Sequence, residues 1–219
     1  MKKKFKLNWS ARSHNFLKQE KKAVLDVMTH ADPLTQGKYL AKFENDFKKY
    51  LKSKGEAFGV TSGASAIELA AACLDLKPND EIIIPAHTYC ATALPFTRYK
   101  AKIIWADIDL DTMSISCEQI RKLISKKTKA IIAVHLYGLP SNVLEIKKII
   151  KNKKIVLIED CAQALGAKIN NKNVGNFGDF AVFSFHAQKN ISTLGEGGML
   201  VVNNKKYQKY IPGLRHNGH

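Results

Sequence analysis

The sequence predicts a three-layer α/β/α fold, in which helices cover both faces of a mostly parallel central sheet. Continuous apolar runs such as "EIIIP" and "KIVLIED" are typical of strands that are buried on both faces. Segments with helical periodicity separate these runs, and this alternation indicates a parallel sheet. In such open sheets, ligands bind beyond the carboxyl ends of the strands, so functional residues are expected there.

The amino-terminal half alternates in this way. Residues 1–36 are predicted to form an arm and a first helix, which "DPLTQG" interrupts with a proline and a glycine. From Lys38, apolar residues recur at helical spacing and predict an amphipathic helix. The next expected elements are the strand "AFGV", the helix "SAIELAAACLDL" closed by Pro78, the strand "EIIIP", the helical segment "CATALPFTRY" and the strand "AKIIWADI".

The carboxyl-terminal half continues the pattern and adds a hairpin. The expected elements are the helix "CEQIRKLIS", the strand "KAIIAVHL", the helix "SNVLEIKKIIKN" and the strand "KIVLIED". "GAKINNKNVG" is predicted to form a hairpin around Asn170 and Asn171, because asparagine favours tight turns. The strands "FAVFSF" and "GMLVVN" and a partial helix "KKYQKYIPGLR" complete residues 37–219, which we expect to form one large domain.

The composition indicates a globular protein. Hydrophobic residues make up 45% of the 219 residues. The longest apolar runs, such as "AIIAVHLYGL", are far shorter than the ~20 residues that a membrane span needs. "MKKKFKLNW" begins like a signal peptide, but no apolar segment follows its lysines. The sequence therefore predicts a cytoplasmic protein without a membrane partner.

The formal net charge of +16 raises the question of nucleic-acid binding. Bidentate recognition of phosphates and bases favours arginine over lysine. Most of the 35 basic residues are lysines spread along the chain, and the arginines are Arg12, Arg98, Arg121 and Arg215. Nucleic acid is therefore not the expected partner.

The cysteines form no recognisable metal or disulfide pattern. They show no C-x-x-C pair and no companion histidine spacing, and they are Cys73, Cys90, Cys117 and Cys161. We expect buried, reduced thiols, no metal and no disulfide framework.

The first candidate site follows the strand "AFGV". "GVTSGASAIELA" runs through Gly63 into a helix, and the free amides at a helix start suit a phosphate. A plain strand-to-helix turn would have the same sequence. The segment is not a dinucleotide fingerprint, and Thr61 stands where a nucleophile elbow has serine.

Two further strand ends carry polar or aromatic residues. "VLIEDCAQA" places Glu159 and Asp160 at a strand end with Gln163 nearby, where a carboxylate serves a ligand or caps the next turn. "PAHTYCAT" places His87 and Tyr89 in a loop at the same edge, where an aromatic ring lies on a flat ligand or packs into the core.

The fourth strand end carries a lysine. In "FAVFSFHAQKN", a strand ends at Ser184 and Phe185, and Lys189 follows. A partly desolvated lysine is a nucleophile, whereas most lysines are simply exposed. A phosphate cradle, a strand-end acid, an aromatic ring and a lysine are together what pyridoxal phosphate requires.

These motifs resemble the pyridoxal-phosphate-dependent sugar aminotransferases of the DegT/DnrJ/EryC1/StrS family over nearly the whole chain. They follow the family's order: "LTQG", "TSGASAIELA", "DEIIIPAHTYCATA", "ADIDLDTMSI", "KAIIAVHLYG", "IEDCAQALGA", "GNFGDFAVFSFHAQKN" and "GEGGMLVVN". The resemblance implies an aspartate-aminotransferase-like large domain (PLP fold type I) over residues 37–219.

The resemblance also implies roles for individual residues. Lys189 matches the catalytic lysine that forms a Schiff base with the cofactor, and Asp160 matches the aspartate paired with the pyridine nitrogen. The other matched cofactor-binding residues are Gln163 beside the ring hydroxyl, Ser184 at the phosphate, Gly63 and Ala64 in the phosphate loop, and Tyr89 against the ring face.

The implied activity is amino transfer from glutamate to a nucleotide-linked keto sugar, in surface-polysaccharide or amino-sugar biosynthesis. The family resemblance also implies a homodimer in which a neighbouring subunit completes the cofactor pocket.

Two features of this sequence depart from the family pattern. Ala64 replaces a threonine of many relatives, and Ser65 is a candidate substitute for its hydroxyl. Family members continue past "GLRHNGH" into a small carboxyl-terminal domain, so we expect this chain to represent the large domain alone.

Two alternatives stay open at this point. One is a pyridoxal-phosphate-dependent sugar dehydratase; the resemblance implies that such relatives have histidine in place of the lysine. Lys189 argues against this alternative, and the nearby His186 leaves it open. The other is an inactive fragment that retains cofactor binding or dimerisation. Neither His186 nor Glu196 receives a role from the sequence.

Overall fold

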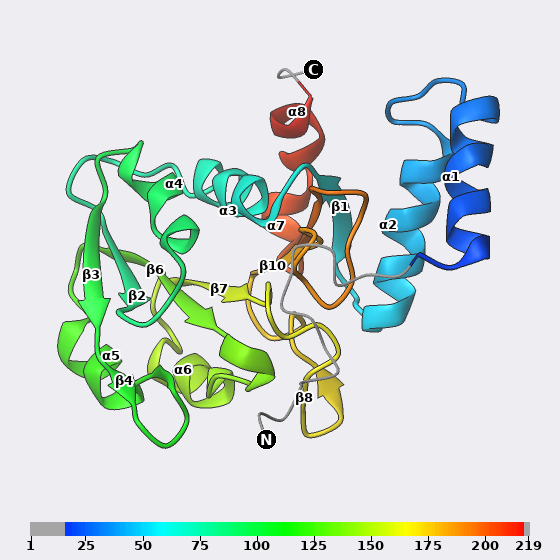
Figure 1. The fold of residues 1–219 in the computed structure, drawn as a ribbon. Helices are drawn as coiled ribbons and strands as arrows, with labels where there is room; N and C mark the ends of the chain where they lie inside the picture. Colours follow the sequence, from blue (N-terminus) through cyan, green and yellow to red (C-terminus); the bar gives the residue numbers. More distant parts are fainter. Residues whose placement is uncertain (1–15, 217–219) are drawn as a thin grey trace, which may run out of the picture.

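Seven strands form one central sheet in the computed structural model, which describes residues 16–216 (Figure 1). All of them run parallel except β11, which is antiparallel to its neighbours on both sides. The predicted mostly parallel sheet is confirmed, while residues 1–15 of the predicted arm lie outside the described residues. The spatial order is β1 (Glu56–Val60), β11 (Gly198–Val202), β10 (Phe180–Ser184), β7 (Val156–Asp160), β6 (Thr128–Val134), β2 (Glu81–Pro85) and β3 (Lys102–Ala106).

Helices cover both faces of the sheet, which confirms the predicted three layers (Figure 1). One face packs against α3 (Gly63–Ala72), α4 (Leu94–Thr97), α7 (Lys205–Gln208) and α8 (Ile211–Arg215). The other face packs against α2 (Lys38–Leu51), α5 (Cys117–Leu123) and α6 (Val143–Ile149). Helix α1 (Lys18–His30) lies beside α2 and buries none of its residues. Within residues 16–216, no helix is long and apolar enough to cross a membrane.

The alternation of side chains along the strands decides which acid faces which layer. In β7, Ile158 belongs to the core shared with α3, and Leu157 belongs to the core on the opposite face. Because successive side chains of a strand point to opposite faces, Asp160 points to the α3 face and Glu159 to the other. Ser184 lies on the α3 face of β10 for the same reason.

Short elements complete the chain and include the predicted hairpin. Asn170 and Asn171 have φ values of 48° and 61°, the left-handed pair that a tight two-residue hairpin turn requires. The remaining elements are the hairpin strands β8 (Lys168–Ile169) and β9 (Lys172–Asn173), the pair β4 (Ile108–Asp109) and β5 (Ser114–Ile115), and the 3₁₀ turns η1 (Cys90–Thr92) and η2 (Leu136–Gly138).

Two expectations from the sequence are wrong. Helix α3 ends at Ala72 and does not reach Pro78, because the chain turns early and Asp75 adopts a left-handed φ of 47°. The cysteines are free, but they are not all buried: Cys161 is buried, whereas Cys90 is exposed at the start of η1.

Candidate functional site

The amino-terminal end of α3 lies directly against the end of β10. Ser62 caps the helix, and its Oγ accepts a hydrogen bond of 3.0 Å from the Ser65 backbone N–H. A Cβ added to Gly63 would lie 3.1 Å from the Ser184 Cβ, so glycine permits the close approach of helix and strand. The backbone N–H groups of Gly63 and Ala64 open the helix beside the half-buried Ser184, and such a helix start favours an anion.

The hydroxyl groups of this turn contact one another. Ser65 Oγ lies 2.8 Å from Thr61 Oγ1 and 3.0 Å from Ser62 Oγ. Ser65 was the candidate to replace the hydroxyl that Ala64 lacks. The Ser65 hydroxyl already has two protein partners. That it binds a phosphate stays a prediction.

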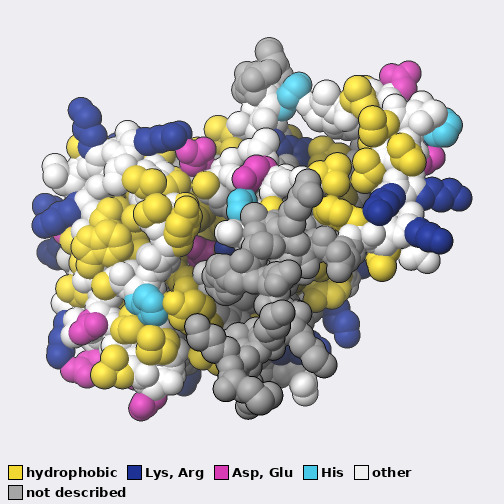
Figure 2. Space-filling view, viewed as in Figure 1, with side chains coloured by type: hydrophobic (Ala, Val, Ile, Leu, Met, Phe, Trp, Pro, Cys, Tyr) yellow, Lys and Arg dark blue, Asp and Glu magenta, His cyan; other side chains and the backbone are white. Residues whose placement is uncertain are grey.

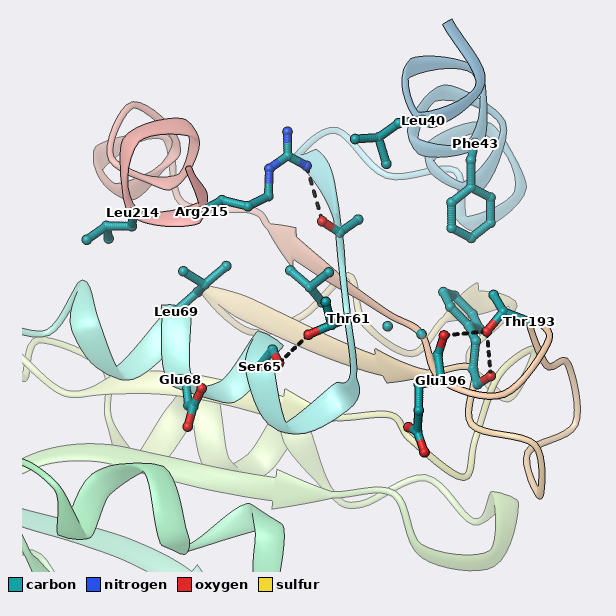
Figure 3. A pocket seen from close by; sticks show the side chains of 15 residues that line it. Leu40, Phe43, Thr61, Ser65, Glu68, Leu69, Thr193, Glu196, Leu214 and Arg215 are labelled. Carbon is teal, nitrogen blue, oxygen red and sulfur yellow. Dashed lines mark hydrogen bonds between the residues drawn. The ribbon is translucent and has the colours of Figure 1, made fainter. Parts of the chain in front are cut away.

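A pocket of about 440 Å³ adjoins the turn between β1 and α3, on the side of α2 and α8 (Figure 3). Arg215 borders it, pairs with Glu44 and donates a hydrogen bond of 3.2 Å to the Gly59 carbonyl oxygen. Ser65 lines the pocket, but Gly63, Ala64 and Ser184 do not, so the pocket lies beside the predicted cofactor site. Its lining includes Leu40, Phe43, Thr61, Ser65, Phe185, Glu196 and Leu214.

Asp160 is buried at the end of β7, and both of its carboxylate oxygens are held. Oδ1 accepts a hydrogen bond of 3.1 Å from the Ala162 N–H, and Oδ2 accepts one of 2.9 Å from the Thr92 hydroxyl. Thr92 Oγ1 also lies 2.9 Å from Thr88 Oγ1. A hydroxyl has one hydrogen, and that of Thr92 goes to Asp160, so Thr88 is the donor to Thr92.

The aromatic loop after β2 and the segment after β7 meet at the same edge. Tyr89 is 71% exposed, so its ring is open to a ligand. Gln163 Oε1 accepts a hydrogen bond of 3.1 Å from the backbone N–H of Tyr137, which has a left-handed φ of 54°. His87 packs edge-on against the Tyr137 ring, with 5.9 Å between ring centroids. The tyrosine that it contacts is exposed, so His87 is not a simple core residue.

Lys189 lies on the loop that joins β10 to β11. It is half-buried, and its backbone N–H donates a hydrogen bond of 2.8 Å to the His186 carbonyl oxygen. His186 Nδ1 accepts a hydrogen bond of 3.2 Å from the Gln188 N–H, and its Nε2 lies 3.3 Å from Glu196 Oε1. Glu196 therefore has a structural partner across the loop, which the sequence did not indicate.

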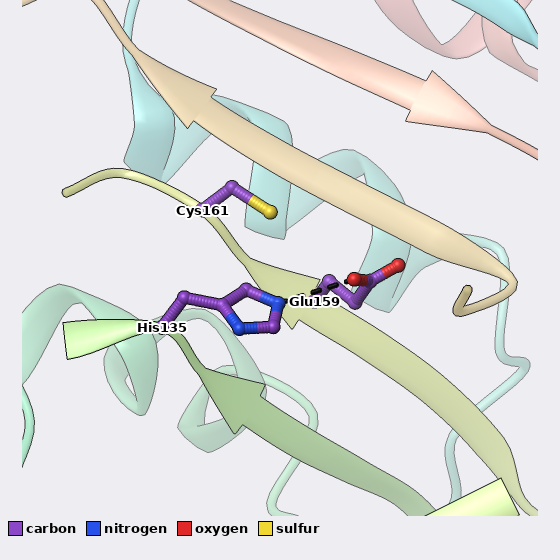
Figure 4. Close-up of side chains that lie close together, drawn as sticks. All are labelled: His135, Glu159 and Cys161. Carbon is purple, nitrogen blue, oxygen red and sulfur yellow. Dashed lines mark hydrogen bonds and ion pairs between the residues drawn. The ribbon is translucent and has the colours of Figure 1, made fainter. Parts of the chain in front are cut away.

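Glu159 points to the opposite face of the sheet from Asp160, where it lies beside His135 (Figure 4). It is fully buried, and its oxygens accept hydrogen bonds of 2.7 to 2.8 Å from three backbone N–H groups, those of Gly175, Phe177 and Gly178. His135 Nε2 lies 3.1 Å from Glu159 Oε2. Burial opposes ionisation, but these donors outweigh it and hold the pKa of Glu159 below its usual range.

Cys161 approaches His135 and Glu159, and the three residues have the spacing of a possible metal site. The lone pairs of His135 and Glu159 already accept or face hydrogen bonds from protein groups. His135 Nδ1 accepts a hydrogen bond of 2.9 Å from the Ser141 N–H, so its Nε2 carries the hydrogen that faces Glu159. Burial raises the pKa of Cys161 well above its usual value, which disfavours the thiolate that a metal needs. We therefore derive no metal site from this cluster.

The structure places every predicted site residue at the carboxyl edge of the parallel strands. It brings Gly63, with Ala64 next to it on α3, against Ser184, and it puts Asp160 on the same face of the sheet as Ser184. Tyr89, Gln163 and Lys189 lie on loops at that edge. Sequence reasoning missed Thr92, because nothing in "CAT" points to a carboxylate 68 positions later.

Comparisons with known proteins give a consistent result. A family model described as the DegT/DnrJ/EryC1/StrS aminotransferase family matches residues 15–219. GDP-perosamine synthase from Vibrio cholerae is 38% identical over 184 residues, which are 84% of this chain and 50% of that protein. The chain spans about half the length of the curated relatives it matches.

Two solved structures are similar over most of the chain. Escherichia coli GDP-4-keto-6-deoxy-D-mannose-3-dehydratase with bound hydrated PLP has a TM-score of 0.87 at 34% identity, covering 95% of this chain and 55% of that one. Helicobacter pylori PseC, an aminotransferase involved in the biosynthesis of pseudoaminic acid, has a TM-score of 0.86 at 31% identity, covering 93% and 54%.

Proposed function

The chain belongs to the DegT/DnrJ/EryC1/StrS aminotransferase family and has PLP fold type I, and we propose that it is a pyridoxal-phosphate-dependent aminotransferase. The proposed acceptor is a nucleotide-linked keto sugar, and the proposed donor is glutamate. Curated relatives named GDP-perosamine synthase and UDP-N-acetyl-3-dehydro-alpha-D-glucosamine 3-aminotranferase support the substrate class. The proposed setting is surface-polysaccharide or amino-sugar biosynthesis.

One observation supports the cofactor site above the others. Ser184 and Asp160 lie at the carboxyl ends of neighbouring strands on one face of the sheet, and the start of α3 touches Ser184. An anion site and a buried carboxylate thus lie a short distance apart, which fits a ligand with a phosphate at one end and a basic nitrogen at the other. The residues present therefore fit pyridoxal phosphate.

The proposed contacts follow from this placement. The N–H groups of Gly63 and Ala64 and the hydroxyl of Ser184 hold the phosphate, and Asp160 pairs with the ring nitrogen. Lys189 would hold the cofactor through its amine. Two loop residues complete the proposed contacts, Gln163 beside the ring hydroxyl and Tyr89 against the ring face.

Bound pyridoxal phosphate supplies an electron sink for the charge that develops on the substrate carbon. The chain's own residues supply the rest. Asp160, anchored through both oxygens, would hold a proton on the ring nitrogen. The Lys189 amine removes a proton from the donor carbon as a base and returns one as an acid. The α3 amides fix the phosphate, and with it the ring, during both events.

The function is tested by supplying the two substrates separately. Purified protein with pyridoxal phosphate and glutamate is expected to release 2-oxoglutarate in an amount that does not exceed the amount of protein. Addition of GDP-4-keto-6-deoxy-D-mannose, the sugar in the name of one relative, or of other nucleotide-linked keto sugars should make release continuous. Initial rates should then follow ping-pong kinetics. Absence of 2-oxoglutarate under all conditions would contradict the proposal.

A second candidate function is dehydration of a keto sugar. It is supported by the structural similarity to a dehydratase of the same family. The resemblance implies histidine at this position in sugar dehydratases of the family, so Lys189 opposes this function. His186 is engaged with Glu196 and Gln188. The same incubation separates the two functions, because a dehydratase would consume the keto sugar without incorporating nitrogen into it.

We also propose that residues 37–219 form the cofactor-binding large domain and that two copies associate. An apolar patch beside the proposed site supports association; Figure 2 shows hydrophobic side chains gathered on this side of the molecule, over β3 and α4. The large exposed hydrophobic residues on these two elements are Leu94 and Trp105. Patches of this kind mark protein interfaces. The proposed compartment is the cytoplasm, in keeping with four unpaired cysteines.

Trp105→Glu is expected to shift the protein from dimer to monomer. Trp105 is 53% exposed on the edge strand β3, so a charge there would be desolvated by a partner and yet harmless to the isolated chain. Sedimentation velocity over a concentration series measures the shift. Tyr210→Glu, at a residue of 47% exposure near α8, is the matched control and should leave the dimer intact. Equal behaviour of the two variants would argue against an interface at β3.

A further inference from the structure

We propose that Thr92 is a positioning residue that orients the Asp160 carboxylate toward the ring nitrogen of the bound cofactor. The inference rests on the function proposed above. Thr92 is not among the residues proposed there to contact the cofactor. Thr92 ends the η1 turn, far along the chain from Asp160, and the fold brings the two side chains together.

The contact is short and shielded from water. Thr92 Oγ1 lies 2.9 Å from Asp160 Oδ2, and the two residues are 1% and 6% exposed. Burial of both groups removes the water that would replace this hydrogen bond. The hydroxyl therefore has a specific partner and is not simply filling space in the core.

The two held oxygens of Asp160 explain what the hydroxyl does. The Ala162 N–H holds Oδ1, and this bond alone would allow the carboxylate to rotate about its bond to Cβ. The Thr92 hydroxyl holds Oδ2 and removes that rotation. A carboxylate accepts about four hydrogen bonds, so lone pairs remain free on both oxygens for a ligand nitrogen.

The same threonine connects the carboxylate to the aromatic loop. The Thr92 backbone N–H donates a hydrogen bond of 3.0 Å to the Tyr89 carbonyl oxygen, and Thr88 donates to the Thr92 hydroxyl. Tyr89, the proposed ring platform, therefore lies between two threonines whose hydroxyls run in series to Asp160. Thr92 therefore connects Tyr89, proposed at the face of the cofactor ring, with Asp160, proposed at its nitrogen.

The test compares two variants and two ligands. Thr92→Val removes the hydroxyl and keeps the shape, and Thr92→Ser keeps the hydroxyl. The ligands are pyridoxal phosphate and its benzene analogue, in which carbon replaces the ring nitrogen. Their dissociation constants are measured by absorbance titration. Both ligands carry the aldehyde and the phosphate, so contributions from Lys189 and from the phosphate site cancel between them.

Thr92→Val is expected to weaken pyridoxal phosphate binding about tenfold and to leave the analogue within about twofold of the wild type. Thr92→Ser is expected to retain most of the wild-type affinity. Equal weakening for both ligands, or no weakening for either, would overturn the inference while leaving the proposed function intact. Failure of the wild type to bind pyridoxal phosphate would overturn both.

A control and a second variant complete the design. Thr97→Val makes the same change on α4, where the exposed hydroxyl bonds only to the Leu94 carbonyl oxygen, and should affect neither ligand. If Thr92→Val does not fold, Thr88→Val tests the same chain of hydroxyls from its outer, half-buried end. It should weaken pyridoxal phosphate about twofold and spare the analogue; equal loss for both ligands would again overturn the inference.

Discussion

Substitution of Lys189 by alanine is expected to abolish the covalent retention of pyridoxal phosphate. Lys189 is the half-buried amine on the loop between β10 and β11, next to the strand end that carries Ser184. Without it, the cofactor retains only reversible contacts. After borohydride reduction and denaturation, intact-protein mass spectrometry should show a cofactor adduct on the wild type and none on the variant.

A matched lysine separates this effect from random modification. Lys205→Ala removes an exposed lysine from α7, away from the proposed site, and should leave the adduct unchanged. Peptide mapping of the wild type should place the adduct on the peptide that contains Lys189. An adduct of equal yield in Lys189→Ala, or one mapped to another lysine, would remove the assignment.

Substitution of Glu159 by glutamine is expected to lower the free energy of unfolding by about 2–4 kcal/mol. The amide oxygen accepts hydrogen bonds as before, but the amide nitrogen is a donor that faces other donors, the Gly175 N–H and His135 Nε2. These groups lose their acceptor at a position closed to bulk solvent, since Glu159 is fully buried. Urea unfolding followed by circular dichroism measures the loss.

The matched control for this variant is Glu118→Gln, which makes the same change on the exposed face of α5. Surface ion pairs contribute little, so its stability should be close to that of the wild type. If both variants unfold at the same urea concentration as the wild type, the carboxylate of Glu159 does not stabilise the fold.

The Glu159 network also predicts a dependence on pH. The pKa of Glu159 is lowered in the folded state, so its contribution is present above the pKa of the unfolded chain, about 4.3. The contribution is lost as the pH falls further and passes through the folded pKa. The stability difference between the wild type and Glu159→Gln should therefore be constant near neutrality and shrink below about pH 4. Urea midpoints measured for both proteins at several pH values test this, and a gap that stays constant in acid would contradict it.

The sequence predicted the layers and most elements because their signals are local. "EIIIP" and "KIVLIED" contain strands that match β2 and β7, and the asparagine pair marks a hairpin turn. The early end of α3 was missed, because Ala72, Cys73 and Leu74 suit a helix and only the return of the chain toward β2 stops it. The exposure of Cys90 was missed for a similar reason, since it depends on where η1 meets the sheet edge.

The sequence indicated which residues belong to the candidate site, but it did not indicate which groups they contact. Lys189, Asp160 and Ser184 follow apolar runs, and the rule for open sheets directs attention to them. Glu159 and Asp160 are adjacent in sequence, yet strand alternation sends them to opposite faces and gives them different partners. Which acid meets which donor depends on pairings across the sheet, and no local pattern encodes these.

The position of β1 has a consequence for how the protein is made. In the sheet, β1 pairs only with β11, and Glu56 lies opposite Val202. The edge strand therefore cannot pair until Val202 has emerged from the ribosome. β10 and β11, in contrast, join as a local hairpin around the lysine loop. Because α3 begins directly after β1, the pairing of its first turn with Ser184 is a late event of synthesis. A nascent chain halted before β11 would have most of its sheet and would lack the contact between the start of α3 and Ser184.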